Sequence, residues 1–493
     1  MFETVELGRK ISAKKYNEQV SQFRLNLLTA QFAMAQADFP VIVIISGVDG
    51  AGKGELVHRL NAWLDPRHVD TTAFWESSDE VEDRPYYWRF WRALPPKRRI
   101  GILFGSWYTR QIIDRVEKKI PKDRFDQEMH RIAFFERMLV NDGAVLVKFW
   151  FHLTKQGQFD ALKKLEKKNR TQGWVTSSDW EFHEKYDRFL KVSERAIRVT
   201  DTGYAPWNLI EAKDRRYREL TAGQILLKAI ESRLRESASS VSIPSEPKLT
   251  ARPVSSKLTV LDQVDLNEKL EDDEYRELLS KYQGELGRLS WEAHRRKVST
   301  VGVFEGWDAA GKGGAIRRIA HAMDPRFLRI IPIAAPTDEE QSQHYLWRFW
   351  RHLSRAGRMT LYDRSWYGRV LVERVEGYAT SKEWQRAYRE INEFEEQLHD
   401  YGIVILKFWI HISKEEQLKR FDQRKKTPFK KHKITDEDWR NRKKWDQYSL
   451  AINDMVNRTS TENASWTLVA GNDKRFARIQ VLKTVCNALK EAL

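Results

Sequence analysis

The sequence predicts an α/β protein built from two tandem three-layer domains, each a parallel sheet covered by helices on both faces. Three observations predict this fold. Landmarks recur at one constant spacing, short apolar runs alternate with helix-length charged stretches, and a glycine-rich loop follows the first apolar run of each half. The chain has 493 residues, 41% of them hydrophobic, which is enough for more than one buried core.

The duplication is the strongest of these observations. The string Trp-Arg-Phe-Trp-Arg begins at Trp88 and again at Trp347, 259 residues later. The glycine-rich loops and several further aromatic landmarks keep the same offset, which indicates a nearly gapless duplication. We therefore expect an N-terminal repeat over residues 1–235, a Ser- and Pro-rich linker over residues 236–258, and a C-terminal repeat over residues 259–493.

Five strand-like runs are separated by stretches of helical length in the C-terminal repeat. They are VGVF from Val301, then residues 327–333, 359–362, 403–412 and 466–469. Strands that alternate with helices favour a parallel sheet. The Trp-Arg-Phe-Trp-Arg string suits a helix that buries its aromatic residues, from which Arg348 and Arg351 can reach a ligand. His411 follows a strand and is expected to be structural.

The first predicted strand of the C-terminal repeat leads into the sequence GWDAAGKGG. This matches the G-x-x-x-x-G-K pattern, in which backbone N–H groups and a helix N-terminus attract phosphate and the lysine neutralises it. Ser or Thr usually follows this lysine and its hydroxyl helps to hold Mg²⁺, but Gly313 stands there in this chain. Another oxygen ligand is therefore needed, and Asp308 is the candidate. A glycine-rich turn with a surface lysine is the alternative. The expected phosphate-binding residues are Gly306, Gly311, Lys312, Gly313 and Gly314.

A second carboxylate follows the third predicted strand, in the sequence YDRSWYGR. Asp363 at the carboxyl end of that strand is placed like the second metal carboxylate of a P-loop enzyme, and Arg364 and Arg369 can clamp phosphate. A strand-capping aspartate with solvated arginines is the alternative. The N-terminal repeat has Phe104 and Gly105 in place of Asp363 and Arg364. We therefore expect the C-terminal repeat to be catalytic and the N-terminal repeat to be structural or substrate-binding.

Basic residues crowd the segment between the fourth and fifth predicted strands. Residues 414–446 hold 13 Lys/Arg and 7 Asp/Glu, whereas the matching residues 155–187 hold 7 and 6. A cationic insert at this position can act as a lid that gathers phosphate charge and excludes water. A solvated helix face is the alternative. The residues expected to bind a phosphate chain are Arg420, Arg424, Lys430 and Lys431.

These motifs together resemble polyphosphate kinase family 2, and the tandem arrangement resembles its two-domain members, the polyphosphate:AMP phosphotransferases. The resemblance covers both repeats. It implies a thymidylate-kinase-like P-loop fold with helical lids and Mg²⁺-dependent transfer of the terminal phosphoryl group of inorganic polyphosphate to AMP, giving ADP; Mn²⁺ can substitute. The site residues that it implies are Asp308 and Asp363 for the metal, with Lys312, Arg364, Arg369 and Glu373.

Composition agrees with an anionic substrate. There are 86 Lys/Arg and 70 Asp/Glu, a net charge of +16. The single cysteine, Cys486, excludes an internal disulfide framework and a multi-cysteine metal site. With no membrane-spanning run and no signal-like N-terminus, a cytoplasmic protein is expected.

Other functions remain open at this point. They are the same transfer to ADP or GDP, an ATP-dependent nucleotide kinase, and a nucleic-acid-binding protein on a degenerate P-loop scaffold. The carboxylates Asp308, Asp363 and Glu373 argue against nucleic acid, because they repel a phosphate chain unless a cation intervenes. The segment from Ala334 onward is expected to contribute to the acceptor pocket. Packing of the repeats as a pair, and a homodimer of the chain, are both compatible with the duplication.

Overall fold

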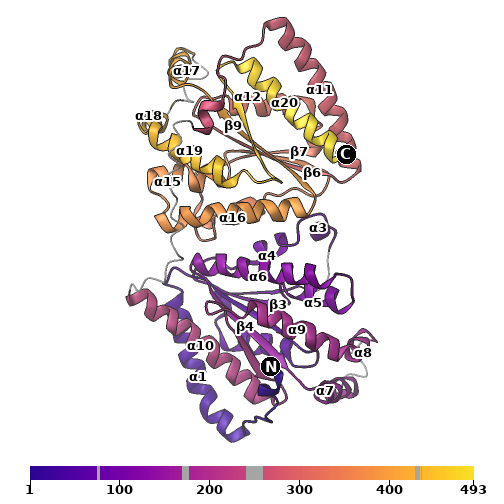
Figure 1. The fold of residues 1–493 in the computed structure, drawn as a ribbon. Helices are drawn as coiled ribbons and strands as arrows, with labels where there is room; N and C mark the ends of the chain where they lie inside the picture. The colour runs from indigo at the N-terminus through magenta and orange to yellow at the C-terminus, as the bar shows by residue number, and fades with distance from the viewer. Residues whose placement is uncertain (75–77, 169–176, 240–258, 428–433, 435) are drawn as a thin grey trace. The chain divides into compact units, whose positions relative to one another are not determined.

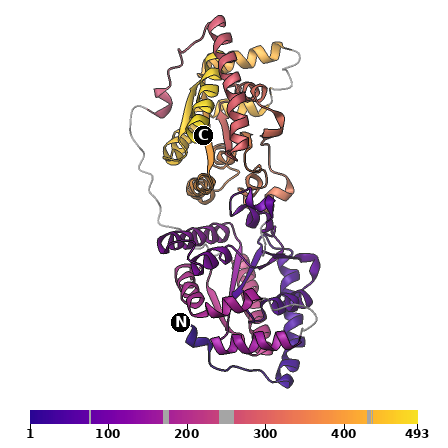
Figure 2. The same cartoon turned by 90° about the vertical axis from the view of Figure 1, so that its right-hand side faces the viewer.

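The computed structural model describes residues 1–74, 78–168, 177–239, 259–427, 434 and 436–493. The described residues form two compact units, each built on its own sheet (Figures 1 and 2). Most of the first unit precedes residue 240 and most of the second follows residue 258. Residues 78–88 group with the second unit and residues 338–344 with the first, so the units differ from the predicted repeats by these two short segments.

The first unit contains a five-stranded parallel sheet of order β2-β3-β1-β4-β5. Its strands are β1 Val41–Gly47, β2 Val69–Ala73, β3 Ile100–Phe104, β4 Val145–His152 and β5 Trp207–Glu211. The helices are α1 Ala13–Met34, α2 Lys53–Trp63, α3 Asp79–Glu82, α4 Trp88–Ala93, α5 Thr109–Val116, α6 Lys122–Asn141, α7 Lys155–Lys168, α8 Ser177–Glu184, α9 Tyr186–Thr200 and α10 Arg215–Ser239. Helix α10 runs into the segment predicted as linker from residue 236.

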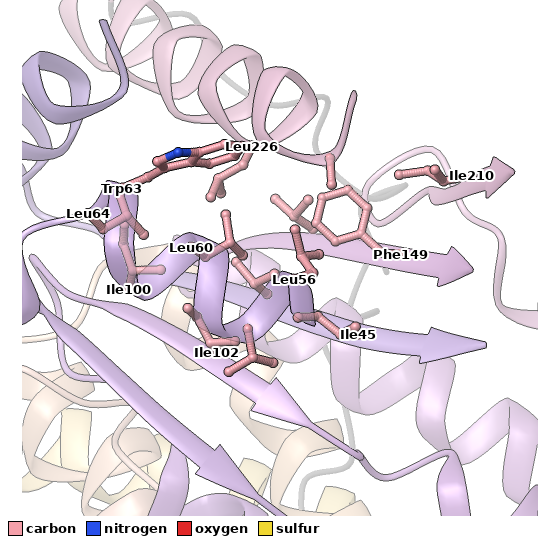
Figure 3. Packing of buried hydrophobic residues seen from close by; sticks show 14 of the residues in the cluster. Ile45, Leu56, Leu60, Trp63, Leu64, Ile100, Ile102, Phe149, Ile210 and Leu226 are labelled. Atoms are coloured by element: carbon pink, nitrogen blue, oxygen red, sulfur yellow. The ribbon is translucent and has the colours of Figure 1, made fainter. Parts of the chain in front are cut away.

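Buried side chains on one face of this sheet form the core with α1, α2 and α10. Figure 3 shows Leu56 and Leu60 of α2 and Leu226 of α10 packed toward Ile45 and Phe149 of the sheet. Alternate residues of β1 face this core because successive side chains of a strand point to opposite faces. Burial of the apolar face of α2 fixes the helix directly behind the loop from which it begins.

The second unit repeats this architecture with sheet order β10-β9-β6-β8-β7, again entirely parallel. Its strands are β6 Ser299–Gly306, β7 Leu328–Pro332, β8 Met359–Asp363, β9 Ile403–His411 and β10 Trp466–Ala470, which confirms the five predicted runs. Its helices are α11 Asp272–Arg295, α12 Lys312–Ala322, α13 Asp338–Gln341, α14 Trp347–Trp350, α15 Val372–Glu376, α16 Ser381–Asp400, α17 Lys414–Lys426, α18 Asp436–Lys443, α19 Trp445–Thr459 and α20 Lys474–Ala492, with the 3₁₀ turn η5 Trp366–Val370.

Helices α11, α12 and α20 lie together on one side of the second sheet, and α15, α16 and α19 lie on the other (Figure 1). The aromatic residues of both Trp-Arg-Phe-Trp-Arg strings are buried, which confirms their prediction as core. Strand β6 lies in the middle of the sheet with β8 beside it, so the carboxyl ends of the two strands carrying the motifs are neighbours. None of the described helices is long and apolar enough to span a membrane.

Each sheet anchors a buried lysine–glutamate cluster at equivalent positions. In the second unit, Lys407 Nζ donates to Glu395 Oε2 at 2.8 Å, to the Tyr367 hydroxyl at 3.0 Å and to the Thr459 carbonyl at 2.6 Å. Trp366 Nε1 and the Tyr367 hydroxyl both donate to the other oxygen of Glu395. Lys148, Glu136, Tyr108, Thr200 and Trp107 make the same set of bonds in the first unit. This cluster therefore belongs to the fold that both units share.

Candidate active site

The glycine-rich loop of the second unit joins β6 to α12, which begins at Lys312. Gly306 has φ 152° and packs on β9, where a Cβ would lie 2.6 Å from the Ile410 carbonyl oxygen, so only glycine fits. Gly311 also has a positive φ, 117°, at the start of the helix. The Lys312 ammonium folds back over the loop and donates to the Gly306 carbonyl at 2.7 Å. The loop thus has the strand–loop–helix context that a phosphate-binding loop requires.

Asp308 lies in this loop and is held by the lid helices. Asn441 of α18 donates through Nδ2 to Asp308 Oδ2 at 2.9 Å, and Gln417 of α17 donates to the Asp308 backbone carbonyl at 3.2 Å. Arg364 Nη2 lies 3.5 Å from Asp308 Oδ1. Two predicted site residues, Asp308 and Arg364, are therefore brought together, and the lid contacts the loop itself.

Strand β8 ends at Asp363, next to the loop: a Cβ added to Gly313 would lie 3.9 Å from Asp363 Oδ2. Arg364 follows with φ 65°, a left-handed conformation that is costly for a non-glycine residue, and its N–H donates to the Phe304 carbonyl at 3.1 Å. Burial lowers the pKa of Arg364, but the surrounding carboxylates, led by Asp308, outweigh it and raise the pKa. Arg364 therefore stays charged beside the loop.

Arg420, predicted to bind the phosphate chain, lines the cleft in front of the loop, and its guanidinium is bonded to the loop backbone. Its side chain is buried, 2% exposed, because the guanidinium inserts against the loop backbone. It donates to the carbonyls of Ala309, Ala310, Gly471 and Asn472 and to the Glu416 carboxylate, at 2.6–3.0 Å. These five bonds match the five N–H groups of a guanidinium. Arg420 thus holds the loop backbone in place. Lys430 and Lys431, the two lysines predicted to bind the phosphate chain, lie outside the described residues.

A cleft of about 830 Å³ opens in front of the loop. The loop, Asp363, Arg364 and the lid residues Arg420 and Arg424 line it. Lys426 of α17, which belongs to the basic segment predicted as the lid, also lines the cleft, and Arg317 of α12 and Lys474 and Arg478 of α20 add cations that were not predicted. Sequence motifs do not reveal these cations. Comparison of the repeats does so for Arg478 and Arg317, because the first repeat has Glu219 and His58 at the equivalent positions.

The remaining predicted residues form a second group on the neighbouring side of β8. Arg369 pairs with Glu373 at 3.2 Å and lies over the Tyr345 ring, 4.5 Å from its centroid. Burial raises the pKa of Glu373, and the charges of Arg369 and Arg348 oppose that rise. Arg348 donates to the Ala334 carbonyl at 3.1 Å. The segment expected to contribute to the acceptor pocket therefore lies beside the predicted Arg348.

Two residues that sequence reasoning did not select lie directly at the loop. Glu305, the residue before Gly306, is 6% exposed and accepts a hydrogen bond from the Ser365 hydroxyl at 2.8 Å. Burial raises its pKa, and the positive charges of Lys312 and Arg364 work against that rise. Trp307 stacks on Trp445 of α19 with ring centroids 3.6 Å apart and donates through Nε1 to His411 Nδ1 at 3.1 Å. His411 is thus a structural partner of the loop, as expected.

The carboxylates suit a hard divalent cation that shares its ligands with a substrate. Among the described residues, no cluster of three or more His, Cys, Asp or Glu side chains forms a complete protein site for a metal. Asp308 and Asp363 flank the phosphate loop, however, and Mg²⁺ in kinases is usually held by one or two carboxylates together with phosphate oxygens and water. The oxygen-only donor set fits Mg²⁺ or Mn²⁺ and does not fit a thiolate- or imidazole-binding metal.

The corresponding loop of the first unit contains its own ion pairs. Lys53 Nζ contacts Asp49 Oδ1 at 2.9 Å and the Gly47 carbonyl at 2.8 Å. Arg218 packs against Gly52, where a Cβ would lie 2.3 Å from its guanidinium carbon, and it donates to the Glu55 carboxylate. At the positions of Glu55 and Arg218 the second unit has Gly314 and Ala477, both of which line the open cleft.

A parallel α/β fold with a phosphate loop, a neighbouring strand-end aspartate and a cationic lid defines a kinase-type phosphotransferase. The family model of polyphosphate kinase 2 matches residues 10–238 and 269–493, so the chain belongs to the polyphosphate kinase 2 family.

Full-length relatives share the tandem arrangement. A polyphosphate:AMP phosphotransferase of Pseudomonas aeruginosa is 51% identical over 100% of this chain and 99% of its own length. One of Acinetobacter johnsonii is 36% identical over 97% of this chain and 98% of its own length. A crystal structure described as polyphosphate kinase 2 from P. aeruginosa has a TM-score of 0.88 and 48% identity, covering 100% of this chain and 99% of that chain.

Proposed function

We propose that the chain transfers the terminal phosphoryl group of inorganic polyphosphate to AMP, giving ADP, and that the second unit performs the reaction. The observation that carries this proposal is the joint presence, around one cleft, of the phosphate loop, Asp363, Arg364 and the lid cations. Full-length relatives named polyphosphate:AMP phosphotransferase support the choice of donor and acceptor.

The cleft suits a polyanion that has no base or sugar to recognise. Arg317, Arg424, Lys426, Lys474 and Arg478 spread positive charge along its walls. Such a surface binds a phosphate chain by charge, with an affinity that falls as salt rises. We place the donor in this cleft, with its terminal group at the loop and Lys312. We place the acceptor phosphate on the side of Arg348 and Arg369.

The reaction needs positioning and charge neutralisation more than it needs a base. The phosphate of AMP is already an anionic nucleophile, so no side chain has to remove a proton from it. Lys312 and Arg364 offset the charge of the phosphoryl group in transit, and the loop N–H groups orient it. Asp308 and Asp363 would hold Mg²⁺, or Mn²⁺ in its place. The ion, when bound, supplies further neutralisation of phosphate charge.

We propose that the first unit is non-catalytic and that the Glu55–Arg218 ion pair closes its phosphate loop to phosphate. It lacks the Asp363 carboxylate and the Arg364 guanidinium, and the Glu55–Arg218 pair stands where the second unit has the small, cleft-lining residues Gly314 and Ala477. The Glu55 carboxylate also lies in the first turn of α2, where it offsets the positive end of the helix that a phosphate would otherwise occupy.

The catalytic test is a donor–acceptor matrix with AMP, ADP and GDP as acceptors and polyphosphate or ATP as donor. ADP formed from AMP and polyphosphate without ATP is expected. Asp363→Asn and Asp308→Asn should each abolish it, whereas Asp49→Asn, the first-unit match of Asp308→Asn, should leave kcat within about twofold, because Asp49 pairs with Lys53 in the unit proposed to be non-catalytic. No ADP from the unaltered chain contradicts the proposed reaction. Loss of activity in Asp49→Asn alone reverses the assignment of the units.

Closure of the first loop is tested by binding of inorganic triphosphate to a Lys312→Met chain, measured by calorimetry. No site that depends on Lys53 is expected. Adding Glu55→Gly and Arg218→Ala, the residues of the second unit, should create one site, and Lys53→Met should remove it. A Lys53-dependent site before these changes contradicts the closure.

A further inference from the structure

Glu305 lies beneath the reacting centre and connects the two strands that carry the motifs. It is the penultimate residue of β6, 6% exposed, and its carboxylate accepts a hydrogen bond from the Ser365 hydroxyl at 2.8 Å. Ser365 in turn accepts a hydrogen bond from the Tyr367 N–H at 3.3 Å and so caps the turn that follows β8. A continuous chain of contacts thus runs from β6 to the turn behind Asp363 and Arg364.

This turn needs support because Arg364 adopts a left-handed conformation. Such a conformation is unfavourable for a non-glycine residue and persists only where the surroundings enforce it. Two hydrogen bonds to β6 support the turn here. The Phe304 carbonyl accepts from the Arg364 N–H, and the Glu305 carboxylate accepts from the hydroxyl of Ser365, the residue after Arg364. Glu305 therefore constrains the residue that directly follows Arg364.

Charge gives Glu305 a second effect. Glu305 lines a small cavity together with Asp308, Lys312 and Arg364. When ionised, the Glu305 carboxylate attracts the Lys312 ammonium and the Arg364 guanidinium.

The first unit provides an internal comparison. At the position of Glu305 it has Ser46, whereas Ser106 keeps the position and the burial of Ser365. Gly105, with φ 77°, adopts the left-handed turn without the strain that Arg364 bears. The glutamate is thus absent from the repeat that also lacks Asp363 and Arg364, although the serine that it would contact is retained. This pattern ties Glu305 to the reaction and not to the fold.

We propose that Glu305 is a positioning residue for phosphoryl transfer, which acts through Ser365 to hold Asp363 and Arg364 in place against the phosphate loop. The inference rests on the proposed function of the second unit. A misplacement of about 1 Å can lower a rate by about 10²-fold, so loss of this contact should appear in kcat.

The test compares Glu305→Ser, Glu305→Gln, Ser365→Ala and the double variant Glu305→Ser/Ser365→Ala, with Ser46→Ala as the matched change in the first unit. Steady-state ADP formation gives kcat and the KM values for AMP and polyphosphate, and circular dichroism gives the melting temperature of each variant. Glu305→Ser should lower kcat by about 10²-fold with less change in either KM. Glu305→Gln keeps the acceptor for Ser365 and should retain more activity than Glu305→Ser, and Ser46→Ala should match the unaltered chain.

The double variant decides whether Glu305 acts through Ser365. If it does, the double variant should have nearly the kcat of Glu305→Ser alone, because the second change removes a contact already lost. Multiplying losses in kcat contradict the proposed route. Unchanged kcat with a lowered melting temperature assigns Glu305 to stability and overturns the inference. Inactivity of the unaltered chain contradicts the proposed function itself, which keeps the two failures distinct.

Discussion

The buried lysine–glutamate clusters allow one perturbation to be made twice in the same chain. Lys407→Met removes the ammonium of the second unit and leaves Glu395, 1% exposed, without its counter-ion. Lys148→Met does the same to Glu136 in the first unit. Methionine retains an unbranched apolar side chain, so both changes remove a charge with little change in shape.

The cost of each change follows from burial. Removing one partner of a buried ion pair typically destabilises by about 3–5 kcal/mol, because the remaining charge is left uncompensated. Glu395 still accepts from Trp366 at 3.0 Å and from Tyr367 at 2.6 Å, which places the cost toward the lower end, at about 3 kcal/mol. The equal geometry of the first cluster predicts an equal cost. Glu395→Gln added to Lys407→Met should recover part of it, since no buried charge then remains.

Lys407→Met and Lys148→Met should lower the stability equally but should differ in their effect on activity. Trp366 and Tyr367 follow Asp363 and Arg364 with only Ser365 between them, so a displaced cluster in the second unit moves the reacting centre. The expected loss in kcat for Lys407→Met is about tenfold or more, whereas Lys148→Met should stay within about twofold.

Urea unfolding followed by tryptophan fluorescence gives the free energies, with each transition fitted separately because two units need not unfold together. Activity is measured at a temperature where both variants are folded. Equal losses of kcat in the two variants would refute the assignment of catalysis to the second unit. A loss of unfolding free energy below about 1 kcal/mol in both variants would refute the argument that burial makes the unpaired glutamate costly.

Three further outcomes are expected. Arg420→Lys should lower kcat/KM for polyphosphate by about tenfold or more, because lysine cannot make five bonds to the loop backbone and Glu416; an unchanged value would show that those bonds do not shape the loop. Burial lowers the pKa of His411 to about 4 from its ordinary 6.5, so its contribution to stability is full above pH 6.5 and is lost as the pH falls toward 4. His411→Gln should therefore remove about 2 kcal/mol of the difference in unfolding free energy between pH 7 and pH 5. Identical pH profiles of the variant and the unaltered chain would contradict this. The KM for polyphosphate should rise steeply between about 50 and 200 mM salt while that for AMP changes less, and parallel changes would place the cationic cleft on the wrong substrate.

Local sequence was sufficient to predict the sheet, the phosphate loop and the strand-end aspartate. The loop pattern requires a strand before it and a helix after it, and adjacent parallel strands bring Asp308 and Asp363 to one edge. The inward direction of Arg420 could not be predicted, because the face of α17 that contacts the loop depends on how the lid packs. Glu305 was missed for a related reason: at the end of an apolar strand, nothing local shows that it meets Ser365, sixty positions along the chain.

Comparison of the two units separates what the fold requires from what the reaction requires. The buried Lys–Glu cluster occurs in both units with nearly the same distances, so it is a requirement of the shared fold. The left-handed turn after the third strand also occurs in both, but with Gly105 in one and the strained Arg364 in the other. Glycine can form this turn without strain, whereas arginine in the same conformation lowers the stability of the fold by about 1–3 kcal/mol. The strain therefore marks Arg364 as a residue kept for what its side chain does, and the bonds from Phe304 and Glu305 are what make the strained turn possible.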